Sequence, residues 1–78
     1  MNVLEVLQVC WSLEDPDVAT REKEGLVAAA KEFHLPTGTL ITAFDQYDEI
    51  IDGVTIHIVR LVEWVLQYRN KSDKKYHN

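Results

Sequence analysis

The stretch from residue 26 to residue 44, LVAAAKEFHLPTGTLITAF, most constrains the fold of this chain. Pro36 divides it, because the residue before a proline is pushed out of the α-helical region. Thr37 can then cap a second helix with its hydroxyl group. Apolar residues recur at helical spacing on both sides of the proline, at Leu26, Ala29, Ala30 and Phe33 and then at Leu40, Ala43, Phe44 and Tyr47. The stretch predicts two short helices joined by a tight turn, with Leu40 buried between them.

The rest of the chain is interpreted around that pair. The sequence contains only three glycines and two prolines, which favours a few long elements over many short strands. We therefore predict an all-α domain, a compact bundle of about four helices at residues 2–11, 16–34, 37–51 and 54–70. The domain spans residues 1–70, and the basic residues 71–78 form a disordered tail.

Local signals set the boundaries of these helices. Asp15-Pro16 is a strong helix start, with aspartate as N-cap and proline at the first helical position. Asp52-Gly53 is interpreted as a helix stop and turn. The β-branched residues of 54–59 would suit a strand, and Ile56 falls outside the apolar arc of a helix there. The lack of a second convincing strand to pair with decides for a helix.

Residues 26–44 resemble a helix-turn-helix unit, because Ala30, Leu35, Leu40 and Ala43 fall in its register. The resemblance covers about a quarter of the chain and implies a DNA-binding transcriptional regulator as an alternative function. Ile41 and Asp45 depart from it, since one is apolar and the other repels phosphate, and the implied recognition helix has no lysine or arginine. The base-reading positions would be Thr37, Gly38, Ile41, Thr42 and Asp45, and the candidate DNA-contacting side chains are Thr37, Thr39, Thr42 and Gln46.

The net charge of −5 is unevenly distributed along the chain. Residues 1–53 carry three basic against eleven acidic side chains, a net charge of −8. Residues 54–78 carry five basic against two acidic side chains, a net charge of +3. An acidic surface repels phosphate backbones, so this balance disfavours a nucleic-acid partner.

The sequence contains no recognisable catalytic or metal-binding motif. The three histidines are far apart, and the single cysteine has no partner at zinc-site spacing. Neither a glycine-rich phosphate loop nor a calcium loop is present. The acidic cluster Asp45, Asp48, Glu49 and Asp52 fits an exposed binding surface better than a general acid–base pair. We expect no enzyme activity, no catalytic residue, no cofactor and no metal.

The single cysteine and the apolar runs indicate the cellular compartment in which the protein is expected. Cys10 cannot form an internal disulfide and is expected to be a small buried residue. Glu5 interrupts the first apolar run, which argues against a signal peptide, and the longest apolar run is too short to span a bilayer. A cytoplasmic protein without a membrane interaction is expected.

The last predicted helix carries the main candidate binding surface. His57, Arg60, Trp64 and Tyr68 lie along one flank, and tryptophan, tyrosine and arginine dominate binding hot spots. The competing interpretation is that Trp64 fills the core and Arg60 covers it. We predict a small regulatory or adaptor protein that binds a protein partner, and that forms a homodimer through this helix. The candidate partner-binding residues are His57, Arg60, Trp64, Tyr68, Asp45, Asp48 and Glu49.

Overall fold

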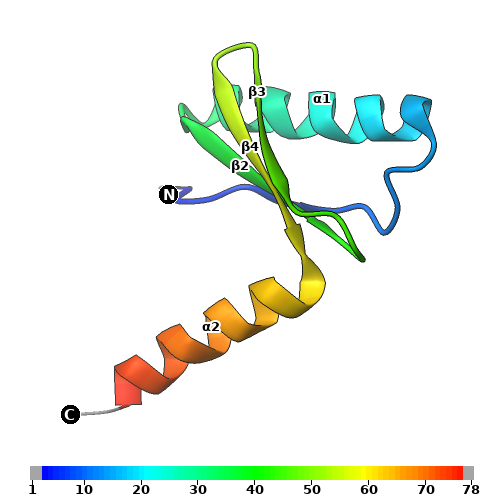
Figure 1. The fold of residues 1–78 in the computed structure, drawn as a ribbon. Helices are drawn as coiled ribbons and strands as arrows, with labels where there is room; N and C mark the ends of the chain where they lie inside the picture. The colour runs from blue at the N-terminus through cyan, green and yellow to red at the C-terminus, as the bar shows by residue number, and fades with distance from the viewer. Residues whose placement is uncertain (1–2, 77–78) are drawn as a thin grey trace.

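In the computed structural model the backbone is described for residues 3–76 and the side chains for residues 3–69. The described residues form one sheet and two helices (Figure 1). The elements are β1 (Leu7–Val9), α1 (Pro16–Glu32), β2 (Thr37–Thr42), β3 (Tyr47–Ile51), β4 (Val54–Arg60) and α2 (Leu61–Tyr76). The predicted all-α bundle is therefore wrong. The helix predicted at residues 16–34 is present as α1, and of the helix predicted at residues 54–70 only the part from Leu61 onward is helical.

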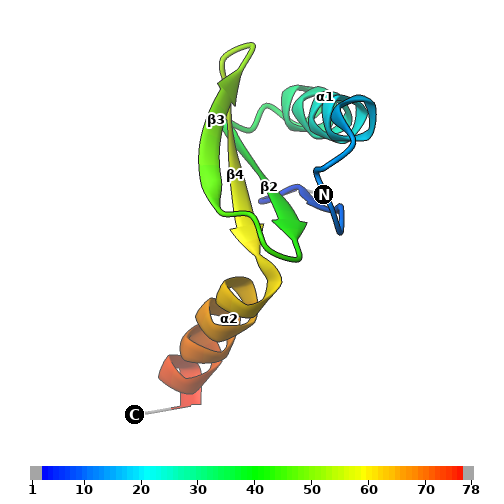
Figure 2. The same cartoon turned by 45° about the vertical axis from the view of Figure 1, so that its right-hand side comes forward.

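The sheet has four strands in the order β1-β2-β4-β3. β1, β2 and β4 run parallel, whereas β3 pairs with β4 in the antiparallel direction. α1 connects the parallel strands β1 and β2, as a crossover helix must, and it covers one face of the sheet (Figure 2). α2 continues from the end of β4 and projects away from the rest of the molecule (Figures 1 and 2).

The signals read from the sequence at both ends of α1 are correct. The Asp15 carboxylate accepts hydrogen bonds from the backbone N–H groups of Asp17 at 2.9 Å and Val18 at 3.4 Å, as an N-cap does. At the other end, the Leu35 N–H donates to the Ala30 carbonyl at 2.8 Å. His34 has a φ of 58° and donates to Lys31, which completes a Schellman motif.

The core lies between α1 and the sheet. Leu26, Val27 and Ala30 of α1 pack against one side of the two central strands. The sheet contributes Leu40, Val54, Ile56 and Ile58, and Cys10 joins the same cluster. Leu40 is fully buried, as predicted, but it reaches the core from a strand and not from a helix. Cys10 is also buried, as predicted, with 8% of its surface exposed.

Residues 37–51 form two strands instead of a helix, and residues 54–60 form a third. In β4, Val54, Ile56 and Ile58 are buried while the residues between them are partly exposed, which is the period of a strand. Asp52-Gly53 is a two-residue hairpin loop with φ of 53° and 83°, so it joins β3 to β4. An Asp-Gly loop with both φ values positive is a favoured hairpin connection, and no helix stops there.

The helix-turn-helix resemblance is also wrong, because β2 follows α1 where a recognition helix would lie. Thr37, Thr39 and Thr42 belong to this strand, and Gln46 lies in the β2–β3 connection. Thr42 is buried, and its hydroxyl group exchanges hydrogen bonds with the backbone of Asp45 at 2.9 and 3.0 Å. The strand leaves no helix for the major groove of DNA.

The predicted first helix is absent from the part of the chain that the structure describes, and the predicted last helix begins later than expected. Residues 2–11 contain the short strand β1 in place of a helix, whereas the last helix begins only at Leu61 and extends to Tyr76. The predicted disorder of residues 71–78 falls partly on this helix and partly outside the described residues, so it stays a prediction. Neither described helix is long and apolar enough to cross a membrane.

Candidate binding groove

A row of side chains crosses the face of the sheet that α1 leaves uncovered. Leu7 of β1 lies opposite Thr39 of β2, which lies opposite His57 of β4. Asp48 of β3 completes the row opposite His57. Successive side chains of a strand point to opposite faces, so these four alternate with the core residues Leu40 and Ile56. The strand register thus gathers residues from four separate segments.

α2 supplies the facing wall. Trp64 and Tyr68 lie four residues apart on one side of the helix, with stacked rings whose centroids are 5.7 Å apart at an interplanar angle of 19°. Between this wall and the sheet lies a groove of about 680 Å³. We call it the sheet–helix groove. It is lined by Glu5, Leu7, Thr39, Gln46, Tyr47, Asp48, His57, Ile58, Val59, Trp64, Gln67 and Tyr68.

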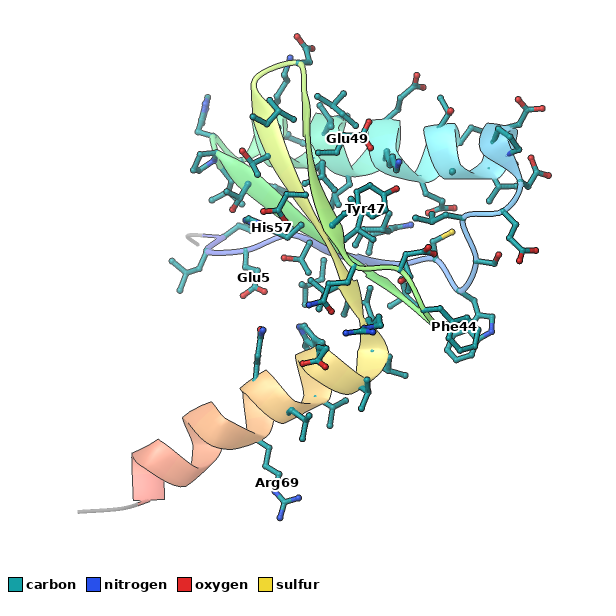
Figure 3. All side chains as sticks on the ribbon, viewed as in Figure 1. Glu5, Phe44, Tyr47, Glu49, His57 and Arg69 are labelled. Carbon is teal, nitrogen blue, oxygen red and sulfur yellow. The ribbon has the colours of Figure 1, made fainter. Side chains whose placement is uncertain are left out.

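The groove is negatively charged. Glu5 and Asp48 bring carboxylates to it, and in Figure 3 Glu5 extends from the N-terminal segment toward α2. The Nδ1 atom of His57 lies 2.9 Å from Oδ1 of Asp48, so the two side chains form a cross-strand pair. Of the described residues, no lysine or arginine lines the groove. Its electrostatic field therefore favours a cationic group.

Four of the predicted partner-binding residues, His57, Trp64, Tyr68 and Asp48, come together in this groove. Arg60 lies at the junction of β4 and α2. Its Nε atom is 3.4 Å from Oε1 of Gln46, and its guanidinium group is 3.6 Å from Glu63. Asp45 lies in the β2–β3 connection, outside the groove lining. The seven predicted residues therefore do not form one surface.

Glu49 points to the opposite face of the sheet. Its carboxylate lies 2.7 Å from the Lys23 ammonium of α1, which also donates to the Tyr47 hydroxyl group at 3.0 Å. Burial disfavours the charged form of Lys23, but the hydrogen bonds to Glu49 and Tyr47 outweigh it and raise the pKa of Lys23 above its ordinary value. Glu49 thus joins α1 to β3 in this structure.

Sequence reasoning missed the sheet side of the groove. Glu5, Leu7, Thr39 and Val59 all fall in predicted helices, with Thr39 as a candidate DNA contact, although Val59 belongs to a segment with strand periodicity. That periodicity was the available signal for residues 54–60. Nothing local could have placed Leu7 beside Thr39, because parallel pairing joins segments that are distant in the sequence.

The described side chains form no candidate metal site. Among the side chains described, those of residues 3–69, no group of three or more histidine, cysteine, aspartate or glutamate residues is arranged to hold a metal ion. In comparisons with known proteins, the chain matches no family model, and no curated protein or solved structure is significantly similar to it.

Proposed function

We propose that this protein is a non-catalytic regulatory or adaptor domain that acts by protein–protein binding and self-associates through α2. The apolar side chains on the outward side of α2 carry this proposal. Val62, Val65 and Leu66 are 58%, 47% and 47% exposed. At 100° per residue, Val62 and Leu66 lie about 140° and 180° from the mean direction of Trp64 and Tyr68, and Val65 lies on the flank, about 80° from it. We call these three residues the outward stripe.

Self-association follows from the cost of leaving the outward stripe in water. Completing the burial of three half-exposed aliphatic side chains would stabilise an assembly by roughly 1 kcal/mol each. A second copy presents the same stripe, and a two-fold axis lets identical patches cover each other. Contiguous exposed apolar patches on a small domain commonly mark such contacts. We place this assembly in the cytoplasm, where a chain with one buried, unpaired cysteine is stable without disulfides.

Sedimentation velocity over a concentration series tests the proposal. We expect a concentration-dependent dimer for the wild type and a monomer for Leu66→Glu, because a charge at the stripe would be buried without a partner. Leu4→Glu is the matched control, since Leu4 is 88% exposed in the N-terminal segment and the chemical change is identical. Circular dichroism should show all three proteins folded. A monomeric wild type, or a dimer that survives Leu66→Glu, contradicts the proposal.

A further inference from the structure

The sheet–helix groove combines negative charge with aromatic surface, and these two features are independent. Glu5 and Asp48 come from the two outer parts of the sheet, whereas Trp64 and Tyr68 come from α2. Carboxylates attract a cation at long range, and the faces of aromatic rings attract it at short range. Both features therefore favour a cationic group.

The volume and lining of the groove indicate which kind of cationic group fits it. Its volume of about 680 Å³ falls within the usual range for sites that take a small ligand or a few side chains. Leu7, Val59 and the Thr39 methyl group offer an apolar floor for an aliphatic stem, while the carboxylates remain near water. A planar guanidinium group can stack on an aromatic ring and donate in parallel to a carboxylate, which an ammonium group cannot do.

We propose that the sheet–helix groove binds an arginine-bearing peptide segment of a partner protein. The arginine side chain lies across Leu7 and Val59 with its guanidinium group against the Trp64–Tyr68 wall, while the carboxylates of Glu5 and Asp48, at opposite sides of the sheet, supply the attracting field. This site is separate from the outward stripe, because none of Val62, Val65 and Leu66 lines the groove. The inference therefore does not depend on self-association.

The chain's own basic side chains are the competing occupants, and His57 lies in the groove itself, paired with Asp48 through the 2.9 Å contact of its Nδ1 atom with Oδ1. Arg60 is engaged by Gln46 and Glu63, and Lys23 lies on the other face of the sheet. Arg69 extends away from the groove in Figure 3. The basic end of a second copy could still reach the groove, and binding data distinguish this occupant through its dependence on protein concentration.

The test is a calorimetric titration with a short arginine-containing peptide and the same peptide carrying neutral citrulline. We expect the arginine peptide to bind and the citrulline peptide to bind roughly 3- to 10-fold more weakly, the range for one cation–π contact with a charge contribution. The double variant Glu5→Gln/Asp48→Asn should weaken arginine-peptide binding by a similar factor. Trp64→Leu, which keeps an apolar side chain but removes the indole face, should also weaken it.

The matched control is Glu14→Gln/Glu32→Gln, which removes the same charge from exposed positions outside the groove lining. Equal weakening by this control would show diffuse electrostatic attraction and overturn the inference, as would equal binding of the two peptides. Repeating the titration with Leu66→Glu separates the groove from self-association. Apparent affinity that falls as protein concentration rises would show that a second copy fills the groove, which also overturns the inference.

Discussion

Gly38 sets how closely α1 can approach the sheet. A methyl group at this position would lie 2.9 Å from Cγ of Leu26 and 3.2 and 3.3 Å from its two Cδ atoms. Leu26 is a core residue, so it has little room to move aside. The close contact of helix and strand thus depends on the missing side chain of one residue.

Gly38→Ala should therefore destabilise the protein by about 1–3 kcal/mol, the usual cost of overpacking a core. The measurement is the midpoint of urea unfolding. Gly25→Ala is the matched control, because Gly25 is exposed within α1 and a methyl group there meets no atom within 4 Å. That change should stabilise the protein by about 1 kcal/mol through helix propensity. Equal effects of the two substitutions would show that α1 does not contact the sheet at Gly38.

Ion pairs as well as packing join α1 to β3, the antiparallel edge strand. Lys23 bonds to Glu49 and Tyr47, and its ammonium group lies 5.3 Å from the centre of the Tyr47 ring. Lys31 pairs with Asp52 in the β3–β4 loop. The two pairs connect α1 to the middle of β3 and to the loop that follows it, and β3 has no other strand on its outer side.

The Lys23–Glu49 pair predicts a pH dependence. The pKa of Lys23 is raised in the folded state, so its stabilising contribution is complete below the unfolded lysine value of about 10.4 and is lost as pH rises through the folded pKa. Glu49→Gln should lower stability by roughly 0.2–1 kcal/mol at neutral pH, as for a partly exposed pair. The difference between wild type and variant should shrink above pH 10. A difference that stays constant across this range would mean that the ion pair does not contribute.

The helix α1 and the strands differ in how far the local sequence predicts them. α1 was predictable because Asp15-Pro16 and the residues before Pro36 carry their signals within one turn of the helix. The strands were not identified because β2, the partner that β4 needs, lies within a stretch that also has helical spacing. Ile56 was the informative residue. It falls outside the apolar arc of a helix, yet it is fully buried in a strand.

The candidate site was predictable only on its helical side. Trp64 and Tyr68 are four residues apart on a real helix, so their shared flank followed from spacing alone. His57 was placed beside them on a helix but reaches the groove from β4. The sheet side depends on the parallel register of β1, β2 and β4, which no local pattern encodes.

The whole molecule is extended for its length. Its radius of gyration is 13.6 Å and its principal dimensions are 46 × 31 × 18 Å. A compact domain of 78 residues has a radius of gyration of about 11.5 Å. The excess comes from α2, which projects beyond the sheet (Figure 1). The side chains of its outward stripe are about half exposed. This projecting helix is why a second copy is the expected neighbour.

Isotope-filtered nuclear Overhauser spectroscopy tests whether the outward stripe forms the contact between two copies of the protein. A sample that mixes labelled and unlabelled chains reports only contacts between different copies. Self-association through the outward stripe predicts cross-peaks between copies for the methyl groups of Val62, Val65 and Leu66, because a two-fold axis brings the same residues together. Contacts between copies that involve only Leu7 and Val59, or none for the stripe at a concentration where the protein is dimeric, would contradict it.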